Sequence, residues 1–333
     1  MMSRKNPNTT DNKKYEARNT KYEIRNKLKL NERMIMKRNL FFRGTGTALV
    51  TPFASDGVVD ENALKFLIDF QIKNGVEAII PAGTTGESAT LSEGELQFVI
   101  RTVVEKARGK VKVIAGAGSN DTSKAIKLAR LACEAGADAI LSVTPYYNKP
   151  TQEGLYRHYA VIAEEVDAPI VMYNVPGRTA SNMDAETVLR IAEEIPNIIG
   201  VKEASGNLSQ IMEILRNRHA GFGVWSGDDA ITLPMIALGA DGVISVVSNE
   251  VPKLFSRMVR FALDGKFDQA LKLHNNLLPL MNFNFIESNP IPVKAVLAEM
   301  GYIAEVYRLP LIPLSDKHRS KMISLLKNLK LIK

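Results

Sequence analysis

The sequence predicts an α/β fold, a (β/α)8 TIM barrel with a small C-terminal helical appendix. From residue 44 onward, eight short strand-like runs alternate with longer helix-like segments. Each short run is apolar on both faces, which is typical of parallel strands that helices cover on the outside. Because eight such units in succession close into a barrel, a barrel is the architecture that we expect.

The strand-like runs are short, and each ends in or just before a small or turn-forming residue. They span residues 47–50, 78–81, 111–115, 139–143, 170–174, 198–202, 223–226 and 242–246. Amphipathic segments such as 64–68, 125–129 and 188–192 lie between them and favour helices. Asp121 and Asp184 precede two of these segments and are typical N-cap residues.

After residue 247 the strand-like runs stop, and only helical patterns follow. They cover roughly residues 250–264, 267–282, 290–300 and 315–330, separated by prolines. We therefore expect three parts: a basic N-terminal extension over residues 1–43, a barrel over 44–264, and a C-terminal helical region over 265–333.

A net charge of +7 taken alone would suggest a nucleic-acid partner, but the excess positive charge lies in one terminal segment. Residues 1–43 hold 13 Lys or Arg and 4 Asp or Glu, and the remaining 290 residues hold 30 basic and 32 acidic side chains. The extension also repeats itself, as Lys-Tyr-Glu-Ala-Arg-Asn and then Lys-Tyr-Glu-Ile-Arg-Asn. We expect it to be disordered, or translated from upstream of a start at Met34 or Met36; a nucleic-acid arm or a targeting peptide is the alternative.

The extension lacks an apolar run long enough for a signal peptide or a membrane span. The only cysteine, Cys133, excludes a disulfide within the chain, which fits a reducing compartment. We expect a cytoplasmic enzyme without a nucleic-acid or membrane partner.

In a barrel of this kind the active site lies at the carboxyl ends of the strands. Lys202 ends the sixth run, and a lysine amine that burial keeps neutral can form an imine with a carbonyl. Tyr173 ends the fifth run and could move protons beside it. Alone, such a lysine is more often a solvated surface group, and such a tyrosine is more often part of the core.

Two further polar features follow strands. Thr84 and Thr85 lie in a glycine-rich turn, where they could relay protons and hold a carboxylate, or serve only as turn and cap residues for a helix near Ser92. Arg178, in a Pro-Gly loop, is suited to a bidentate grip on a second carboxylate, or is a loop arginine without a partner. The four histidines lack metal-ligand spacing, and the loop 116–120 lacks the third glycine of a dinucleotide fingerprint, so we expect no metal and no cofactor.

Several segments together resemble the dihydrodipicolinate synthase family, within the class I pyruvate-dependent lyases. The resemblance runs from about Gly44 to the C-terminus and leaves out only the extension. It rests on residues 44–53, 83–91, 145–150, 173–179, 200–204 and 289–294.

The resemblance implies a condensation of pyruvate with L-aspartate 4-semialdehyde, an early step of lysine and diaminopimelate synthesis. Lys202 would form the Schiff base with pyruvate, and Tyr173 would donate and accept protons beside it. Thr84 would link Tyr173 to Tyr147, which would reach in from a neighbouring subunit of a homotetramer built from dimers.

The remaining site residues implied by the resemblance bind substrate. They are Thr85, Ile244 and Gly227 for pyruvate, and Arg178 for the carboxylate of the aldehyde. N-acetylneuraminate lyase and the 2-keto-3-deoxy sugar acid aldolases are alternatives within the family. They resemble the chain at Lys202 and Tyr173 but generally lack the Arg178-Thr179 ending.

One departure from the family bears on regulation. Feedback-inhibited members resemble this chain at Ser88, Ala89, Asn120 and Tyr146, where they bind lysine, but they have a glutamate at the position of Lys124. Because a second cation would repel the ammonium group of lysine, we expect weak or absent inhibition.

Two alternatives lie outside the enzyme class. One is a membrane- or RNA-associated carrier, in which the basic extension would be the functional part. The other is a catalytically silent scaffold, which would be expected to have lost Lys202 or Tyr173, and both are present.

Overall fold

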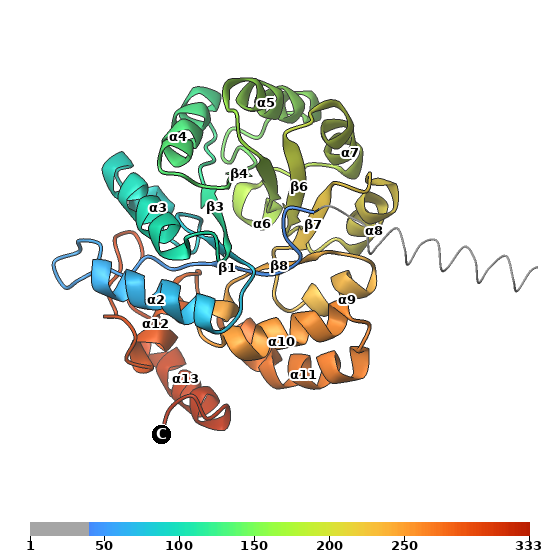
Figure 1. Cartoon of the computed structure of the whole chain (residues 1–333). Coiled ribbons are helices and arrows are strands. Elements are labelled where there is room, and N and C mark those ends of the chain that lie inside the picture. Colours follow the sequence, from blue (N-terminus) through green and yellow to red (C-terminus); the bar gives the residue numbers. More distant parts are fainter. Residues whose placement is uncertain (1–39) are drawn as a thin grey trace, which may run out of the picture. The chain divides into compact units, whose positions relative to one another are not determined.

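The computed structural model describes residues 40–333, and Figure 1 shows a ring of helices around a central barrel. Eight parallel strands close the barrel in chain order, with β1 hydrogen-bonded to both β2 and β8. The predicted TIM barrel is confirmed. The strands are β1 (Gly44–Ala48), β2 (Ala78–Ile80), β3 (Lys112–Gly116), β4 (Ala139–Val143), β5 (Ile170–Asn174), β6 (Ile198–Glu203), β7 (Gly223–Ser226) and β8 (Gly242–Ser245).

The first strand begins three residues before the predicted run. Gly44 pairs with Gly242 of β8, and a Cβ on Gly242 would lie 1.9 Å from the carbonyl oxygen of Gly44. Two glycines therefore allow the close approach that closes the barrel. The prediction missed this segment because glycines carry no apolar side chain, and apolar patterning was the signal used.

Helices follow the strands on the outside of the barrel (Figure 1). The capping residues predicted from sequence begin two of them, because Asp121 caps α4 through the backbone N–H of Lys124, and Asp184 precedes α7. The barrel helices are α2 (Glu61–Lys73), α3 (Glu93–Ala107), α4 (Thr122–Glu134), α5 (Gln152–Glu165), α7 (Ala185–Glu194), α8 (Leu208–Asn217), α9 (Thr232–Ala237) and α10 (Pro252–Leu263). Three short turns were not predicted: η1 (Ser88–Thr90), α6 (Pro176–Thr179) and η2 (Val247–Asn249).

The C-terminal region adds α11 (Phe267–Phe283), α12 (Ile291–Glu299) and α13 (Asp316–Asn328), close to the predicted bounds. Helix α11 packs on α10, and Met322 and Leu326 of α13 join the same apolar cluster. Val293 and Leu297 of α12 pack with the buried face of α2. This region is therefore continuous with the barrel core.

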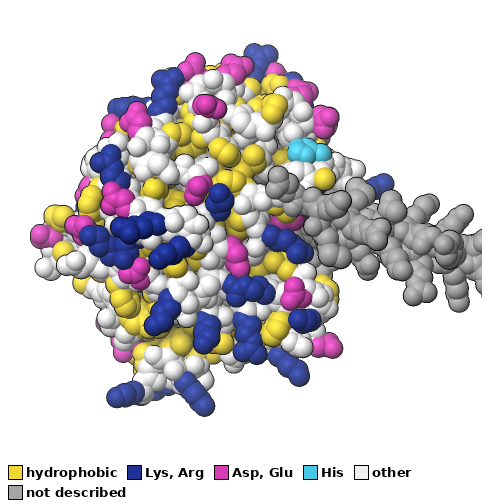
Figure 2. All heavy atoms as spheres, in the orientation of Figure 1, with side chains coloured by type: hydrophobic (Ala, Val, Ile, Leu, Met, Phe, Trp, Pro, Cys, Tyr) yellow, Lys and Arg dark blue, Asp and Glu magenta, His cyan; other side chains and the backbone are white. Residues whose placement is uncertain are grey.

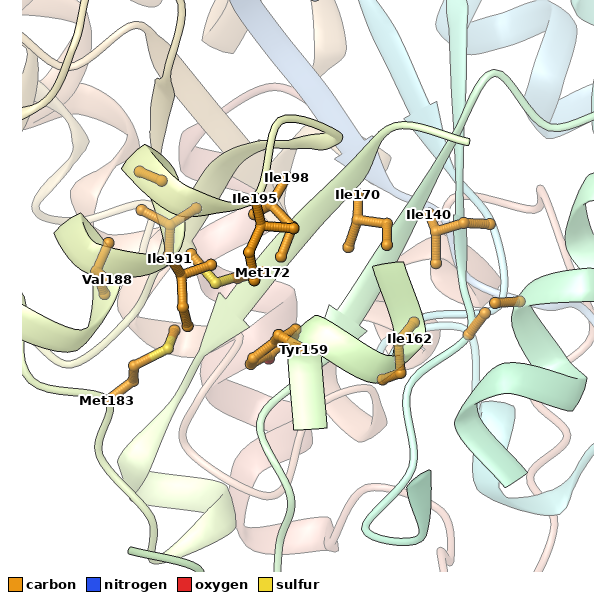
Figure 3. Close-up of a cluster of buried hydrophobic side chains, with 14 of the residues drawn as sticks. Ile140, Tyr159, Ile162, Ile170, Met172, Met183, Val188, Ile191, Ile195 and Ile198 are labelled. Atoms are coloured by element: carbon orange, nitrogen blue, oxygen red, sulfur yellow. The ribbon is translucent and has the colours of Figure 1, made fainter. Parts of the chain in front are cut away.

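The largest apolar cluster lies between the strands and the helices on one side of the barrel. Figure 3 shows isoleucines from β4, β5 and β6 meeting side chains of α5 and α7. Burial of this surface drives the helices onto the sheet. It also fixes the strand ends, from which the functional side chains project.

The predicted 1–43 extension lies almost entirely outside the described residues. Within the described part, Phe42 is buried and stacks on Trp225, with ring centroids 4.6 Å apart. Among residues 40–333, no helix has the length and apolar character needed to cross a membrane. Basic and acidic side chains both occur across the face seen in Figure 2.

Candidate active site at the carboxyl ends of the strands

A cavity of about 620 Å³ opens at the carboxyl ends of the strands. Its wall combines strand ends, the β2–α3 loop and residues 288–290 from the C-terminal region. Of the eight predicted site residues, five line it: Thr84, Thr85, Tyr173, Arg178 and Lys202.

Lys202 is buried near the end of β6, with 5% of its surface exposed. Burial lowers the pKa of its amine to about 7, an effect that the Asp229 carboxylate opposes and the Arg178 guanidinium reinforces. A large fraction of the amine is therefore neutral near pH 7. A neutral lysine amine is a nucleophile toward carbonyl carbon.

Tyr173 lies beside Lys202 because the two residues are paired in the register of β5 and β6. The Nζ atom of Lys202 is 4.2 Å from the centroid of the Tyr173 ring. Burial raises the pKa of the phenol, while Arg178 and a hydrogen bond with Thr84 act in the opposite direction. The phenol is thus protonated at neutral pH and within reach of groups that bind at Lys202.

The ends of β5 and β6 are tied together just beyond these two residues. Asn174 donates a hydrogen bond of 3.0 Å to the buried carboxylate of Glu203, which also accepts the backbone N–H of Ser205 at 2.7 Å. A residue directly after Tyr173 is thereby linked to the residue directly after Lys202. This link holds the two functional side chains side by side.

Thr84 and Thr85 lie in the β2–α3 loop, but they do not cap α3. Ser92 caps that helix in a capping box with Glu95, so the alternative role of the two threonines as its cap is wrong. Thr85 is buried and accepts a hydrogen bond of 3.0 Å from the side chain of Asn289. The sequence interpretation named the segment that contains Asn289 but gave that residue no role.

Arg178 lies in the short helix α6 and reaches the same wall of the cavity. Its guanidinium donates to the carbonyl oxygen of Asn289 at 3.4 Å. Asn289 therefore contacts both Thr85 and Arg178. Its Oδ1 atom is buried and has no hydrogen-bond partner among the described residues.

The other three predicted site residues do not line the cavity. Gly227 packs against Lys202, and a Cβ there would lie 3.1 Å from Cε of the lysine, so a side chain would displace the amine. Ile244 is buried in β8. Tyr147 is 89% exposed, and within residues 40–333 it does not line the cavity.

Asp229, three residues after the end of β7, was not given a role from sequence. It is 1% exposed, and its Oδ2 atom accepts the backbone N–H groups of Val246 and Val247 at 3.0 and 2.8 Å. Burial raises its pKa to about 6. Its ionised form stabilises the protonated amine of Lys202.

Within residues 40–333, no group of three or more His, Cys, Asp or Glu side chains is arranged to hold a metal ion. Among the predicted site residues, those that line the cavity provide an amine, a phenol, two hydroxyls and a guanidinium. A TIM barrel with a buried lysine of lowered pKa beside a tyrosine, at the carboxyl ends of its strands, is the arrangement of an enzyme that can form an imine with a carbonyl substrate.

The chain belongs to the dihydrodipicolinate synthetase family, whose model matches residues 41–329. A 4-hydroxy-tetrahydrodipicolinate synthase of Chloroherpeton thalassium is 55% identical over 279 residues, which cover 84% of this chain and 92% of that protein. A crystal structure of a dihydrodipicolinate synthase has a TM-score of 0.85 at 52% identity, covering 87% of this chain and all of the other. A structure described as a monomeric dihydrodipicolinate synthase variant has a TM-score of 0.86 at 46% identity, covering 87% and 98%.

These comparisons confirm the family that the sequence resembled. They also confirm the predicted enzyme class, a lyase, and the predicted activity, that of a 4-hydroxy-tetrahydrodipicolinate synthase. The roles of individual residues are inferred from the geometry of the cavity.

Proposed function

We propose that this enzyme binds pyruvate as a Schiff base on Lys202 and condenses it with L-aspartate 4-semialdehyde. The observation that carries the proposal is the buried amine of Lys202, with a pKa of about 7, beside the ring of Tyr173 in a cavity at the carboxyl ends of the strands. Thr85, Ile244 and Gly227 would complete the pyruvate site.

The chemistry begins when the neutral amine attacks the ketone carbon of pyruvate and water leaves. Tyr173 supplies the proton that the departing oxygen needs. Loss of a methyl proton from the iminium ion gives an enamine, whose carbon adds to the aldehyde. The amine of the second substrate then displaces Lys202 and closes the ring, so that the overall reaction releases one water.

The presence of Arg178 favours a second substrate that is an aldehyde with a carboxylate group. Arg178 lines the cavity on the same wall as Thr85, and a guanidinium can hold a carboxylate through two parallel hydrogen bonds. A polyhydroxylated sugar aldehyde offers no such group near its reacting end. We therefore favour L-aspartate 4-semialdehyde over the substrates of N-acetylneuraminate lyase or the sugar acid aldolases.

The proposal includes a second copy of this chain. Tyr147 would contact Thr84 of a neighbouring subunit and extend the proton relay from Tyr173 to solvent, in a homotetramer of paired dimers. The high exposure of Tyr147 supports this role, because a large aromatic side chain that is 89% exposed is available to a partner. The proposed location is the cytoplasm.

Borohydride reduction in the presence of pyruvate tests the proposal. Reduction traps a Schiff base as a stable amine, so peptide mass mapping should place the adduct on the peptide that contains Lys202. Lys294, which is also fully buried, is the internal control and should stay unmodified. An adduct on another lysine, or none, would overturn the mechanism; faster turnover with N-acetylmannosamine than with aspartate semialdehyde would overturn the substrate.

The rate of Schiff-base formation should rise with pH and level off above about pH 7. Below that value Lys202 is protonated, and the rate should fall about tenfold per pH unit. Asp229→Asn removes a charge that raises the pKa of Lys202, so the midpoint of the variant's pH–rate curve should lie at a lower pH than that of the wild type. Single-turnover trapping across a pH series measures the two midpoints. A wild-type midpoint near the ordinary lysine value of 10.5 would contradict the assignment of Lys202 as the nucleophile.

Lysine should inhibit this enzyme weakly or not at all. Lys124 lines the outer part of the cavity with Ser88, Ala89 and Tyr146, and its cation would repel the ammonium of lysine. Lys124→Glu should strengthen inhibition by at least about tenfold, equivalent to roughly 1.4 kcal/mol. Initial rates in a coupled assay measure it, and submillimolar inhibition of the wild-type enzyme would refute the expectation.

A further inference from the structure

The motif at residues 289–294 has no part in the mechanism given so far, yet it contains a buried lysine. Lys294 lies on α12, and its Nζ atom is 2.6 Å from Oε1 of Glu87. The lysine side chain is 0% exposed and the glutamate side chain 1%. An ion pair withdrawn so completely from water needs a reason beyond net stability, because an apolar pair of similar volume is often as stable.

Glu87 belongs to the same loop as Thr84 and Thr85. Its φ of +54° is left-handed, which a residue with a side chain adopts at a cost of about 1–3 kcal/mol. The backbone N–H of Glu87 bonds the carbonyl oxygen of Thr84 at 3.1 Å, so the position of Glu87 is linked directly to that of Thr84. Fixing the Glu87 carboxylate therefore fixes the turn that carries the threonines.

Aromatic and basic groups from the β1–α2 loop and from the C-terminal region surround the pair. Lys294 and Arg308 each lie 4.3 Å from the centroid of the Phe53 ring. The backbone N–H of Arg308 approaches the second oxygen of Glu87 at 3.4 Å, and its guanidinium bonds the carboxylate of Glu95 at the start of α3. The C-terminal region thus holds the β2–α3 loop at its middle and also holds the first turn of the helix that follows it.

We propose that Lys294 and Glu87 are positioning residues of the active site. Their ion pair holds the β2–α3 loop so that Thr84 contacts the phenol of Tyr173 and Thr85 faces the cavity. This inference rests on the proposed function, since it assigns the pair a purpose in proton transfer beside Lys202. Asn289, two residues before the start of α12, bonds Thr85 and supports the same loop.

The test is the double variant Glu87→Gln/Lys294→Met, which removes both charges and keeps the side-chain volumes. Because no charge is left unpaired, its melting temperature should stay near that of the wild type. We expect kcat to fall about 10–100-fold, the size of effect that a displacement of about 1 Å produces at a reacting group. The KM for pyruvate should change less than kcat.

The matched control is Arg218→Met/Asp241→Asn. That ion pair is also buried, but it lies before β7 and β8, at the opposite ends of the strands. Its loss should lower the melting temperature without lowering kcat, because the bonds that Arg218 donates to the carbonyl oxygens of Phe222 and Gly239 are lost with it. Every kcat is divided by the fraction of Lys202 that borohydride traps with pyruvate, so that unfolded protein does not count as slow enzyme.

A stable Glu87→Gln/Lys294→Met variant with wild-type kcat would overturn the inference, as would an equal loss of kcat in the control. If the double variant does not fold, Glu87→Asp gives the decision, because it keeps both charges but shortens the reach of the carboxylate toward Lys294 by one methylene group; kcat should again fall, and a wild-type kcat in this variant would overturn the inference. Failure of the wild-type enzyme to trap pyruvate on Lys202 would instead overturn the proposed function.

Discussion

Replacing Lys202 by methionine is expected to abolish Schiff-base formation and to lower kcat by on the order of 10⁴-fold or more, as loss of a catalytic nucleophile does in other enzymes. Methionine has a similar length and is apolar, so it fits a site that is only 5% exposed. Folding should not suffer, because the substitution removes a group that burial disfavours in its charged form. Steady-state kinetics, borohydride trapping and thermal unfolding measure the three effects.

The matched control is Lys112→Met, at the start of β3. Lys112 is exposed and lies 3.7 Å from Asp138, at the end of the barrel opposite to the cavity. Its loss should leave kcat unchanged, since exposed ion pairs contribute little. If Lys202→Met retained a tenth of the wild-type activity, another amine would be the nucleophile and the mechanism would have to be abandoned.

The sequence predicted the barrel because parallel strands buried on both faces leave a strong apolar pattern. Seven of the eight strand-like runs match the observed strands to within about one residue at either end, and the exception is β1. The start of β1 is determined by the close approach of Gly44 to Gly242, a contact between residues almost 200 positions apart. Local patterning contains no information about such a contact.

The same distinction applies to the cavity. Tyr173 and Lys202 could be expected together because neighbouring parallel strands bring their carboxyl ends to one edge. The bonds from Asn289 to Thr85 and from Lys294 to Glu87 could not be derived this way, because they join the C-terminal region to a loop more than 200 residues earlier. The proposed contact of Tyr147 with a second copy of this chain could not be derived from local patterning either.

Replacing Tyr173 by phenylalanine is expected to lower kcat by about 10²–10⁴-fold, the usual contribution of a general acid and base. The ring would remain next to Lys202, so packing at the end of β5 should be preserved. The missing hydroxyl is the group that Thr84 contacts, and it is the group that we propose gives and receives protons during imine formation. Pyruvate should still be trapped on Lys202, but more slowly than in the wild-type enzyme.

Tyr159→Phe is the matched control for Tyr173→Phe, because both tyrosines are buried and burial raises both pKa values. The hydroxyl of Tyr159 donates to the carbonyl oxygen of Ser142 at 2.9 Å, and Tyr159 does not line the cavity. Its loss removes one of the bonds to a carbonyl oxygen that also lies in the β4–β5 ladder, and should destabilise the fold by about 0.5–1.5 kcal/mol. The two variants should therefore differ in the property that each one lowers. Tyr159→Phe should lower the melting temperature and leave kcat unchanged, whereas Tyr173→Phe should lower kcat and leave the melting temperature unchanged. Equal kcat values for the two variants would show that the phenol of Tyr173 transfers no proton.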